Sequence, residues 1–221
     1  MCSKIVTLVL RLFLLALLFF GANRAEATGI VFNFTGTGSP PSPFGPTISG
    51  SYSFESTTPG IAIPGGVSYV NTITGFNFTS GSYTGGFGGA IQPGALLGPP
   101  FNNISIVDST SEDRYIFNVS FTGASISGSN PRLFELQLND PTGTAFNSAA
   151  LPNVPPSLAS FGGPKQINIF FSGGDFGGTG FVLTSLTLAP TSVPEPSSLL
   201  LIVTGLVAMA LMHRTILRGK E

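Results

Sequence analysis

The chain has 221 residues, among them 29 glycines, 18 prolines and 20 phenylalanines, and only 9% of its residues are charged. The low charge excludes an ordinary disordered chain, which pairs low hydrophobicity with high net charge, and the glycine and proline content excludes long helices over most of the sequence. Between residues 28 and 192 the net charge is minus four, which excludes a nucleic-acid-binding surface rich in lysine and arginine.

The amino-terminal 27 residues predict a secretory signal peptide. Two basic residues come before or at the start of a compact apolar block at 12–20, and the small residues Ala25 and Ala27 follow it. This layout predicts export through the secretion translocon, with cleavage after Ala27. An uncleaved signal anchor is the alternative.

Apolar side chains that alternate with polar ones predict strands through the exported part of the chain. The parity of this alternation switches near Gly75, which predicts a bulge or a corner there. Residues 35–47 and 84–100 are expected to be loops, and residues 141–164, which lack periodicity, are expected to wrap the surface. The expected strands are 30–34, 48–54, 67–73, 76–78, 104–106, 115–121, 134–138, 167–171 and 181–188.

Short strands with antiparallel alternation predict an all-β fold. A single antiparallel domain of the β-sandwich or jelly-roll type fits the strand number and the turns between them. A β-solenoid is the alternative, but the sequence has no fixed repeat period.

The exported part of the chain lacks the residues that several kinds of catalysis need. Cys2 is the only cysteine and is removed with the signal peptide, and the only histidine, His213, lies near the carboxyl terminus. Residues 28–192 therefore hold no imidazole or thiol for nucleophilic catalysis or for an ordinary zinc site. We expect no enzyme, no catalytic residue, no cofactor and no metal.

Two further groups of residues leave alternatives open. The acidic cluster of Asp108, Glu112 and Asp113 is typical of a solvated turn, with a calcium site as the alternative. The four tyrosines either pack in the core or stack on sugar rings at an exposed face. These are Tyr52, Tyr69, Tyr83 and Tyr115.

The carboxyl-terminal segment predicts a membrane-handled signal. An apolar run from Leu199 to Met212 is polar only at Thr204, and a helix of that length spans about 21 Å. A transmembrane helix over 198–213 with a cytoplasmic basic tail fits this order better than a buried terminal helix or a glycolipid-anchor signal. The motif before the run is Val193, Pro194, Glu195 and Pro196, and the basic tail contains Arg214, Arg218 and Lys220.

Val-Pro-Glu-Pro, a short apolar segment and basic residues, in that order, resemble the PEP-CTERM sorting region of bacterial surface proteins. The resemblance covers about one-eighth of the chain, and Pro194-Glu195-Pro196 carries it. It implies processing by exosortase, a membrane transpeptidase-like protease, in bacteria that make exopolysaccharide. One departure is that the family often has a tight arginine cluster, whereas Arg214 and Arg218 are separated here.

Together these features divide the chain into a signal peptide (1–27), a β-rich exported domain (28–192) and a sorting region (193–221). They predict a non-enzymatic cell-surface or matrix protein, held first in the inner membrane and associated with exopolysaccharide. The alternative is a carbohydrate-binding or adhesive β-sandwich module.

Overall fold

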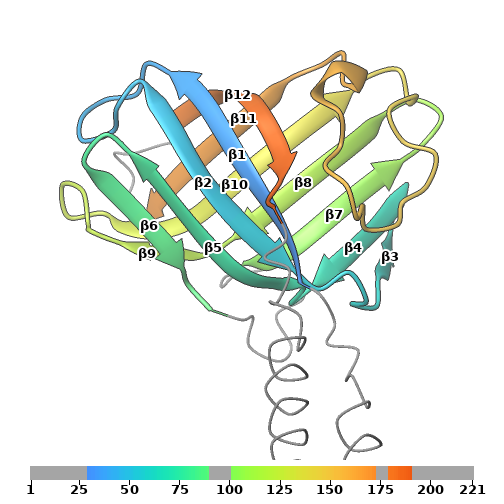
Figure 1. Cartoon of the computed structure of the whole chain (residues 1–221), viewed down its shortest axis with the longest axis horizontal. Helices are drawn as coiled ribbons and strands as arrows, with labels where there is room; N and C mark the ends of the chain where they lie inside the picture. The colour runs from blue at the N-terminus through green and yellow to red at the C-terminus, as the bar shows by residue number, and fades with distance from the viewer. Residues whose placement is uncertain (1–28, 90–100, 173–178, 191–221) are drawn as a thin grey trace, which may run out of the picture. The chain divides into compact units, whose positions relative to one another are not determined.

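Twelve strands and one short 3₁₀ turn, η1 (Leu158–Ser160), make up the regular structure of the computed structural model, which describes residues 29–89, 101–172 and 179–190 (Figure 1). The strands are β1 (Ile30–Gly38), β2 (Thr47–Phe54), β3 (Ile61–Ile63), β4 (Gly66–Val70), β5 (Ile73–Ser80), β6 (Tyr83–Phe87), β7 (Asn102–Asp108), β8 (Asp113–Val119), β9 (Phe121–Gly123), β10 (Asn130–Asp140), β11 (Lys165–Ser172) and β12 (Thr179–Leu188).

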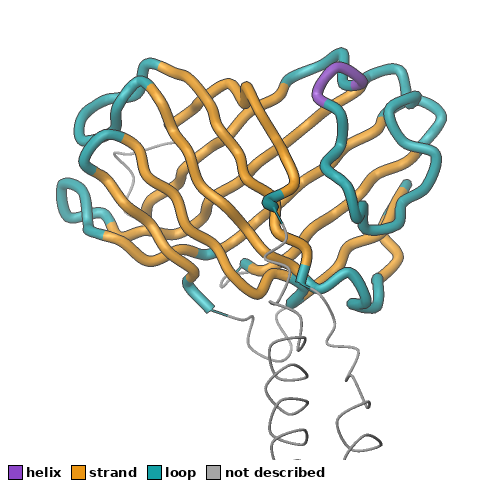
Figure 2. Tube along the Cα trace, in the orientation of Figure 1, coloured by secondary structure: helices purple, strands orange, loops and turns teal. Residues whose placement is uncertain are grey.

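All twelve strands belong to one sheet, in the order β3-β4-β7-β8-β10-β11-β12-β1-β2-β5-β6-β9. The sheet curls, so that a front layer of β12, β1, β2, β5 and β6 lies over a back layer of β11, β10, β8 and β7 (Figures 1 and 2). Rings from the two layers meet between them. The ring centroids of Tyr52 and Phe117 are 4.2 Å apart, and those of Phe34 and Phe134 are 5.4 Å apart.

The prediction of an all-β antiparallel fold is confirmed for the described residues. The two layers are, however, parts of one continuous sheet and not the separate sheets of a sandwich. They are joined where β11 pairs with β12, with Ile167 opposite Phe181. Alternation within each strand indicates which side chains face inward, but hydrogen bonding between strands distant in sequence decides whether two layers are separate.

A second junction lies at Ser120, where β8 continues into β9. The Ser120 amide donates to the carbonyl of Phe101, the residue just before β7, at 2.7 Å. The Ser120 carbonyl accepts from the Gly88 amide at 2.9 Å, on the side of β6. One strand therefore pairs with β7 before this residue and with β6 after it, which is how strands form corners between layers.

Phenylalanine and glycine alternate across the inner face of the front layer. Phe34 pairs with Gly50, Gly50 with Phe78, and Phe78 with Gly85. A Cβ atom on Gly50 would lie 2.6 Å from Phe34 Cζ and 2.9 Å from Phe78 Cα, and a Cβ on Gly85 would meet the Phe78 ring. The rings of Phe34 and Phe78 occupy the space that Gly50 and Gly85 leave.

The two tyrosines at the centre of the core form a hydrogen bond with each other through their hydroxyl groups. Tyr52 and Tyr115 are 1% and 0% exposed, and their hydroxyl groups hydrogen bond at 3.0 Å. Burial raises the pKa of both phenols above the ordinary value of 10.0. Both side chains are therefore neutral at any physiological pH, and each hydroxyl depends on the other for its hydrogen bond.

We expect Tyr52→Phe to destabilise the fold by about 1–3 kcal/mol, because it leaves the Tyr115 hydroxyl buried and unpaired. The double variant Tyr52→Phe/Tyr115→Phe should cost less than the sum of the two single variants. Urea unfolding followed by circular dichroism measures all three. Strictly additive costs would mean that the hydroxyl pair contributes no coupling energy.

The observed strands test three expectations about local structure. The bulge predicted at Gly75 is confirmed, because Ser53 pairs with Gly75 and Phe54 with Ile73, which leaves Thr74 as the extra residue. The expected loop over 84–100 is wrong for its first part, since β6 extends to Phe87. The loop expected over 35–47 is likewise shorter, because β1 continues to Gly38.

Residues 141–164, the cover segment, do more than wrap the surface. Phe161 is 1% exposed, and Phe146 packs edge-on against it at a centroid distance of 5.4 Å. The Tyr69 hydroxyl donates to the Ala149 carbonyl at 2.8 Å and ties the segment to β4. The segment has no strand pattern because it crosses the end of the core instead of extending the sheet (Figure 1).

Two buried aspartates hold the cover segment at β8 and β10. Asp113 and Asp140 face each other across these strands and are 0% and 2% exposed. Asp113 accepts a hydrogen bond from the Phe146 amide at 2.7 Å, and Asp140 accepts one from the Thr144 amide at 3.0 Å. The cover segment is therefore fastened by charge-assisted hydrogen bonds to backbone amides.

Candidate functional site

The residues that the sequence singled out for sorting lie outside the described part of the chain. This holds for the predicted signal cleavage site, the predicted helix over 198–213, the motif and the basic tail. Within the described residues, no helix is long and apolar enough to cross a bilayer. The positions concerned are Ala25, Ala27, Val193, Pro194, Glu195, Pro196, Arg214, Arg218 and Lys220.

The fold brings the two ends of the described chain to the same end of two neighbouring strands in the middle of the sheet. β1 and β12 are antiparallel neighbours, and Phe32 pairs with Leu188. Residue Val193 follows Leu188 by only five positions, a reach of about 17 Å even when the chain is fully extended.

A family model described as the PEP-CTERM protein-sorting motif matches residues 192–214. The chain carries a PEP-CTERM motif. The match covers the tripeptide Pro194-Glu195-Pro196, the apolar run and the first basic residue, Arg214, as the sequence predicted. A PEP-CTERM motif indicates export, processing by an exosortase-like membrane protein and sorting to the cell surface. No curated protein and no solved structure matches the chain.

Two residues of the acidic cluster have different surroundings. Asp113 is buried and accepts a hydrogen bond from the cover segment, whereas Glu112 is partly exposed and forms an ion pair with Arg114. The Ser109 hydroxyl accepts from the Glu112 amide at 3.1 Å and closes the turn between β7 and β8. In the ranges that the structure describes, no group of three or more metal-ligating side chains comes together.

All four tyrosines belong to the core, so the proposal that they stack on sugar rings at an exposed face is wrong. The most exposed of them, Tyr69, is 9% exposed, and Tyr83 is 3% exposed. Tyr83 packs against Phe44 with a centroid distance of 4.9 Å and donates its hydroxyl to the Ala124 carbonyl at 2.8 Å. Each tyrosine combines an apolar ring with a satisfied hydroxyl, which is typical of buried tyrosine.

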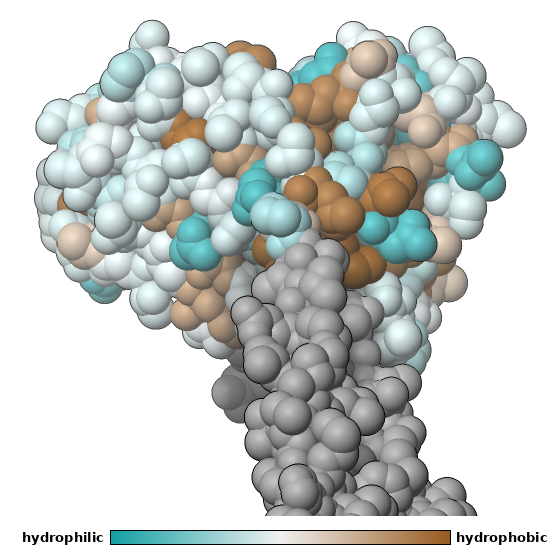
Figure 3. All heavy atoms as spheres, viewed as in Figure 1, coloured by the Kyte–Doolittle hydropathy of each residue, from teal (hydrophilic) through white to brown (hydrophobic). Residues whose placement is uncertain are grey.

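The outward side of the front layer carries short uncharged side chains. Ser51 accepts a hydrogen bond from Asn77 at 2.9 Å, and the hydroxyls of Ser53 and Thr74 are 2.9 Å apart. Figure 3 shows this layer mostly in pale colours of intermediate hydropathy. Its side chains bond mainly to one another, and the charged side chains of the strands are found on the back layer.

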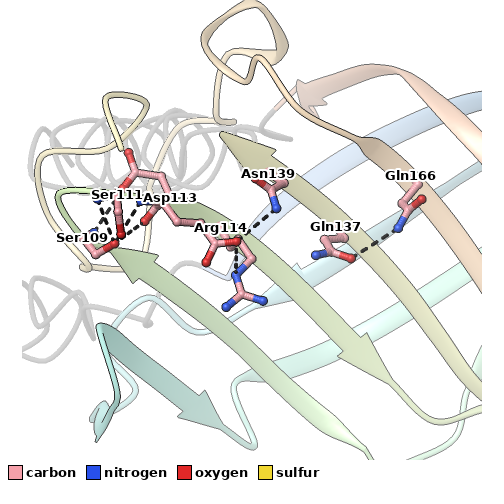
Figure 4. A network of polar contacts seen from close by, with 8 residues as sticks. Ser109, Ser111, Asp113, Arg114, Gln137, Asn139 and Gln166 are labelled. Atoms are coloured by element: carbon pink, nitrogen blue, oxygen red, sulfur yellow. Dashed lines mark hydrogen bonds and ion pairs between the residues drawn. The ribbon is translucent and has the colours of Figure 1, made fainter. Parts of the chain in front are cut away.

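The outward side of the back layer is the stronger candidate for a ligand-binding surface. We call it the outer polar face. Its amide, carboxylate and guanidinium groups stand in rows across the paired strands, and Figure 4 shows Arg114, Gln137, Asn139 and Gln166 along them. The Asn168 amide donates to Glu135 at 3.0 Å, one row from the Gln166–Gln137 contact of 3.4 Å. The face consists of Asn103, Ser105, Arg114, Asn118, Glu135, Gln137, Asn139, Gln166 and Asn168.

A pocket of about 380 Å³ lies at one end of the outer polar face. Its floor is formed by three cross-strand pairs of β7 and β8, and its sides by residues near the β3–β4 turn and before β7. The sequence showed that these strands have a polar side, but not that β7 and β8 meet β3 and β4 there. The lining residues are Ile63, Pro64, Phe101, Asn103, Ser105, Val107, Arg114, Ile116 and Asn118.

Proposed function

We propose that this chain is an exported, non-enzymatic protein of the cell surface or extracellular matrix, processed at its PEP-CTERM motif and associated with exopolysaccharide. The match to residues 192–214 is the observation that carries this proposal. The predicted signal peptide at one end and the motif at the other are the two parts that an exported substrate of a membrane protease needs.

A non-enzymatic role is supported by how the polar groups of the exported domain are used. No histidine or cysteine occurs between residues 28 and 192, so the usual general base and thiol nucleophile are missing. The two buried aspartates, Asp113 and Asp140, accept backbone hydrogen bonds that hold the cover segment. Both carboxylates thus have a structural task that explains their burial.

The position of the motif supports processing next to the folded domain. Leu188 is bonded into the sheet beside Phe32, and the motif begins five residues later. The domain can therefore fold before cleavage while the motif stays within a short reach of the last strand. Cleavage there would release the domain with its two ends on the neighbouring strands β1 and β12.

We expect replacement of Pro194, Glu195 and Pro196 by alanine to leave the chain unprocessed in the membrane fraction of its native cells. The wild-type protein should reach the surface without residues Leu199–Glu221. Fractionation followed by mass spectrometry of the intact protein measures both. The matched control is Pro190→Ala/Thr191→Ala, which changes the same linker and removes a proline but leaves residues 192–214 intact.

The control variant should be processed as the wild type is. Surface protein that retains Leu199–Glu221 would contradict processing, and equal processing of the alanine variant would show that the tripeptide is not what the protease recognises. In cells that lack the exosortase-like protease, the wild-type chain should also remain at full length in the membrane.

A second candidate function is carbohydrate binding, because the pocket on the outer polar face combines polar and apolar groups. This pocket contains none of the four tyrosines that the sequence suggested for sugar stacking. Carbohydrate binding there is compatible with sorting to the cell surface.

A further inference from the structure

The floor of the pocket on the outer polar face is a regular grid. Asn103 faces Asn118, Ser105 faces Ile116, and Val107 faces Arg114 across β7 and β8. Their strand neighbours Ile104, Ile106, Tyr115 and Phe117 point into the core, and each of them is 0% exposed. Strand backbones therefore fix the spacing of the grid, and no loop has to close to form it.

One hydrogen-bond acceptor in this grid has no partner. Asn118 Oδ1 is buried and makes no hydrogen bond with any described residue. An unpaired buried carbonyl is costly, and native proteins rarely keep one without a function or a bound molecule. A ligand with a hydroxyl group would satisfy it.

Arg114 supplies donors beside that acceptor. Its Nε lies 3.1 Å from Glu112 Oε1, and the two form an ion pair in which Nε itself is not aligned for a hydrogen bond. No other bond of the Arg114 side chain is made within the described residues, so the terminal nitrogens are open to a ligand. An acceptor and several donors in one pocket match hydroxyl groups, which both donate and accept.

The charge of the pocket favours an uncharged ligand. Glu112 Oε1 pairs with Arg114 and also accepts from Asn139 Nδ2 at 3.2 Å (Figure 4). The only cationic side chain of the lining is therefore already balanced by a carboxylate. A phosphate or a sugar acid would face Glu112 as well as Arg114, and it would gain less than at an unpaired arginine.

The rest of the lining is arranged to hold a ring with one apolar side. Asn103 Nδ2 donates to Ser105 Oγ at 3.1 Å, and Ser105 Oγ donates to Ser68 Oγ at 2.9 Å, which fixes both polar side chains. Ile116 and Val107 lie among these groups, and Phe101 stands at the side. A pyranose ring has C–H groups on its faces and hydroxyls on its rim, and so it complements such a surface.

We propose that this pocket binds an uncharged sugar residue of a polysaccharide, with Arg114 and Asn118 as its principal hydrogen-bonding groups. This inference rests on the proposed function, because it assumes that the protein meets exopolysaccharide at the cell surface or in the matrix. The rows of Glu135 with Asn168 and of Gln137 with Gln166 continue from the pocket across β10 and β11. Neighbouring sugars of the same polymer would lie along these rows.

The test uses the full-length protein in detergent micelles, with a neutral glucan oligosaccharide and a polyuronate oligosaccharide of equal length as probes. Isothermal titration calorimetry should detect the neutral probe, with weaker or no binding of the acidic one. Asn118→Leu, which removes the acceptor at similar volume, and Arg114→Gln should each weaken binding about tenfold or more. Asn77→Leu, on the outward side of the front layer, should bind as the wild type does.

Circular dichroism and thermal unfolding first establish that each variant is folded. Equal affinity in all four proteins, a preference for the polyuronate, or no binding of neutral oligosaccharides of several linkages would each overturn the proposal. Arg114→Gln should still be sorted and processed normally in cells. Failure of sugar binding with normal sorting would thus refute the pocket alone, whereas failure of sorting in the wild type would refute the proposed function.

Discussion

Gly50→Val should prevent the described fold from forming under conditions in which the wild type is stable. A Cβ atom at this position would lie 2.6 Å from Phe34 Cζ and 2.9 Å from Phe78 Cα, and it would also meet the Asn77 carbonyl oxygen. Overpacking a core ordinarily costs about 1–3 kcal/mol. Here the clashes involve the backbone of β5, at Asn77 and Phe78, as well as the Phe34 ring, so we expect at least the upper end of that range.

The control for this prediction is Gly86→Val. Gly86 lies in β6, where a Cβ would have Thr122 Oγ1 as its nearest neighbour at 3.6 Å, an ordinary contact distance. The substitution adds the same isopropyl side chain to the same sheet on its outward side. Urea unfolding by far-ultraviolet circular dichroism should show little change for Gly86→Val. Equal destabilisation of the two variants would mean that β propensity and not the Phe–Gly row decides the outcome.

The Phe–Gly row also explains which parts of the fold could be predicted from the sequence. Strands with alternating large residues, such as β8 with Tyr115 and Phe117, were visible because every second side chain is apolar. β6 was not visible, since Gly85, at the centre of its inward side between Tyr83 and Phe87, has no side chain to continue the apolar alternation. Its burial is provided by Phe78 of the neighbouring strand, which a local pattern does not reveal.

Of the two candidate sites, one could be predicted from the sequence and the other could not. The PEP-CTERM motif could be recognised because its residues are contiguous in the sequence. The pocket could not, because its floor joins β7 and β8 and its sides come from Ile63, Pro64 and Phe101. The sequence contained one signal for it, the polar residues Asn103, Asn118 and Glu135 on the outward side of strands, but pairing was needed to bring them into one row.

The cover segment should be released in acid, in the range between about pH 4 and pH 2. Hydrogen bonds from the Thr144 amide and the Thr142 hydroxyl hold the pKa of Asp140 at about 2, below the ordinary 3.8 of an aspartate. Because the folded-state pKa is lowered, this carboxylate stabilises the fold fully above pH 4. Its contribution is lost as the pH falls through the folded-state pKa.

Asp140→Asn should remove most of this pH dependence and lower stability at neutral pH. An amide has a single acceptor oxygen, whereas both carboxylate oxygens of Asp140 accept backbone hydrogen bonds, from Thr142 and from Thr144. Asp108→Asn is the matched control, because Asp108 lies in the same half of the sheet but makes no hydrogen bond to the described cover segment. Urea midpoints measured in steps from pH 6 to pH 2 give the comparison, and hydrogen exchange at the Thr144 and Phe146 amides locates the change. If Asp140→Asn and the wild type lost stability in parallel over this range, the carboxylate of Asp140 would not be the group that fastens the cover segment.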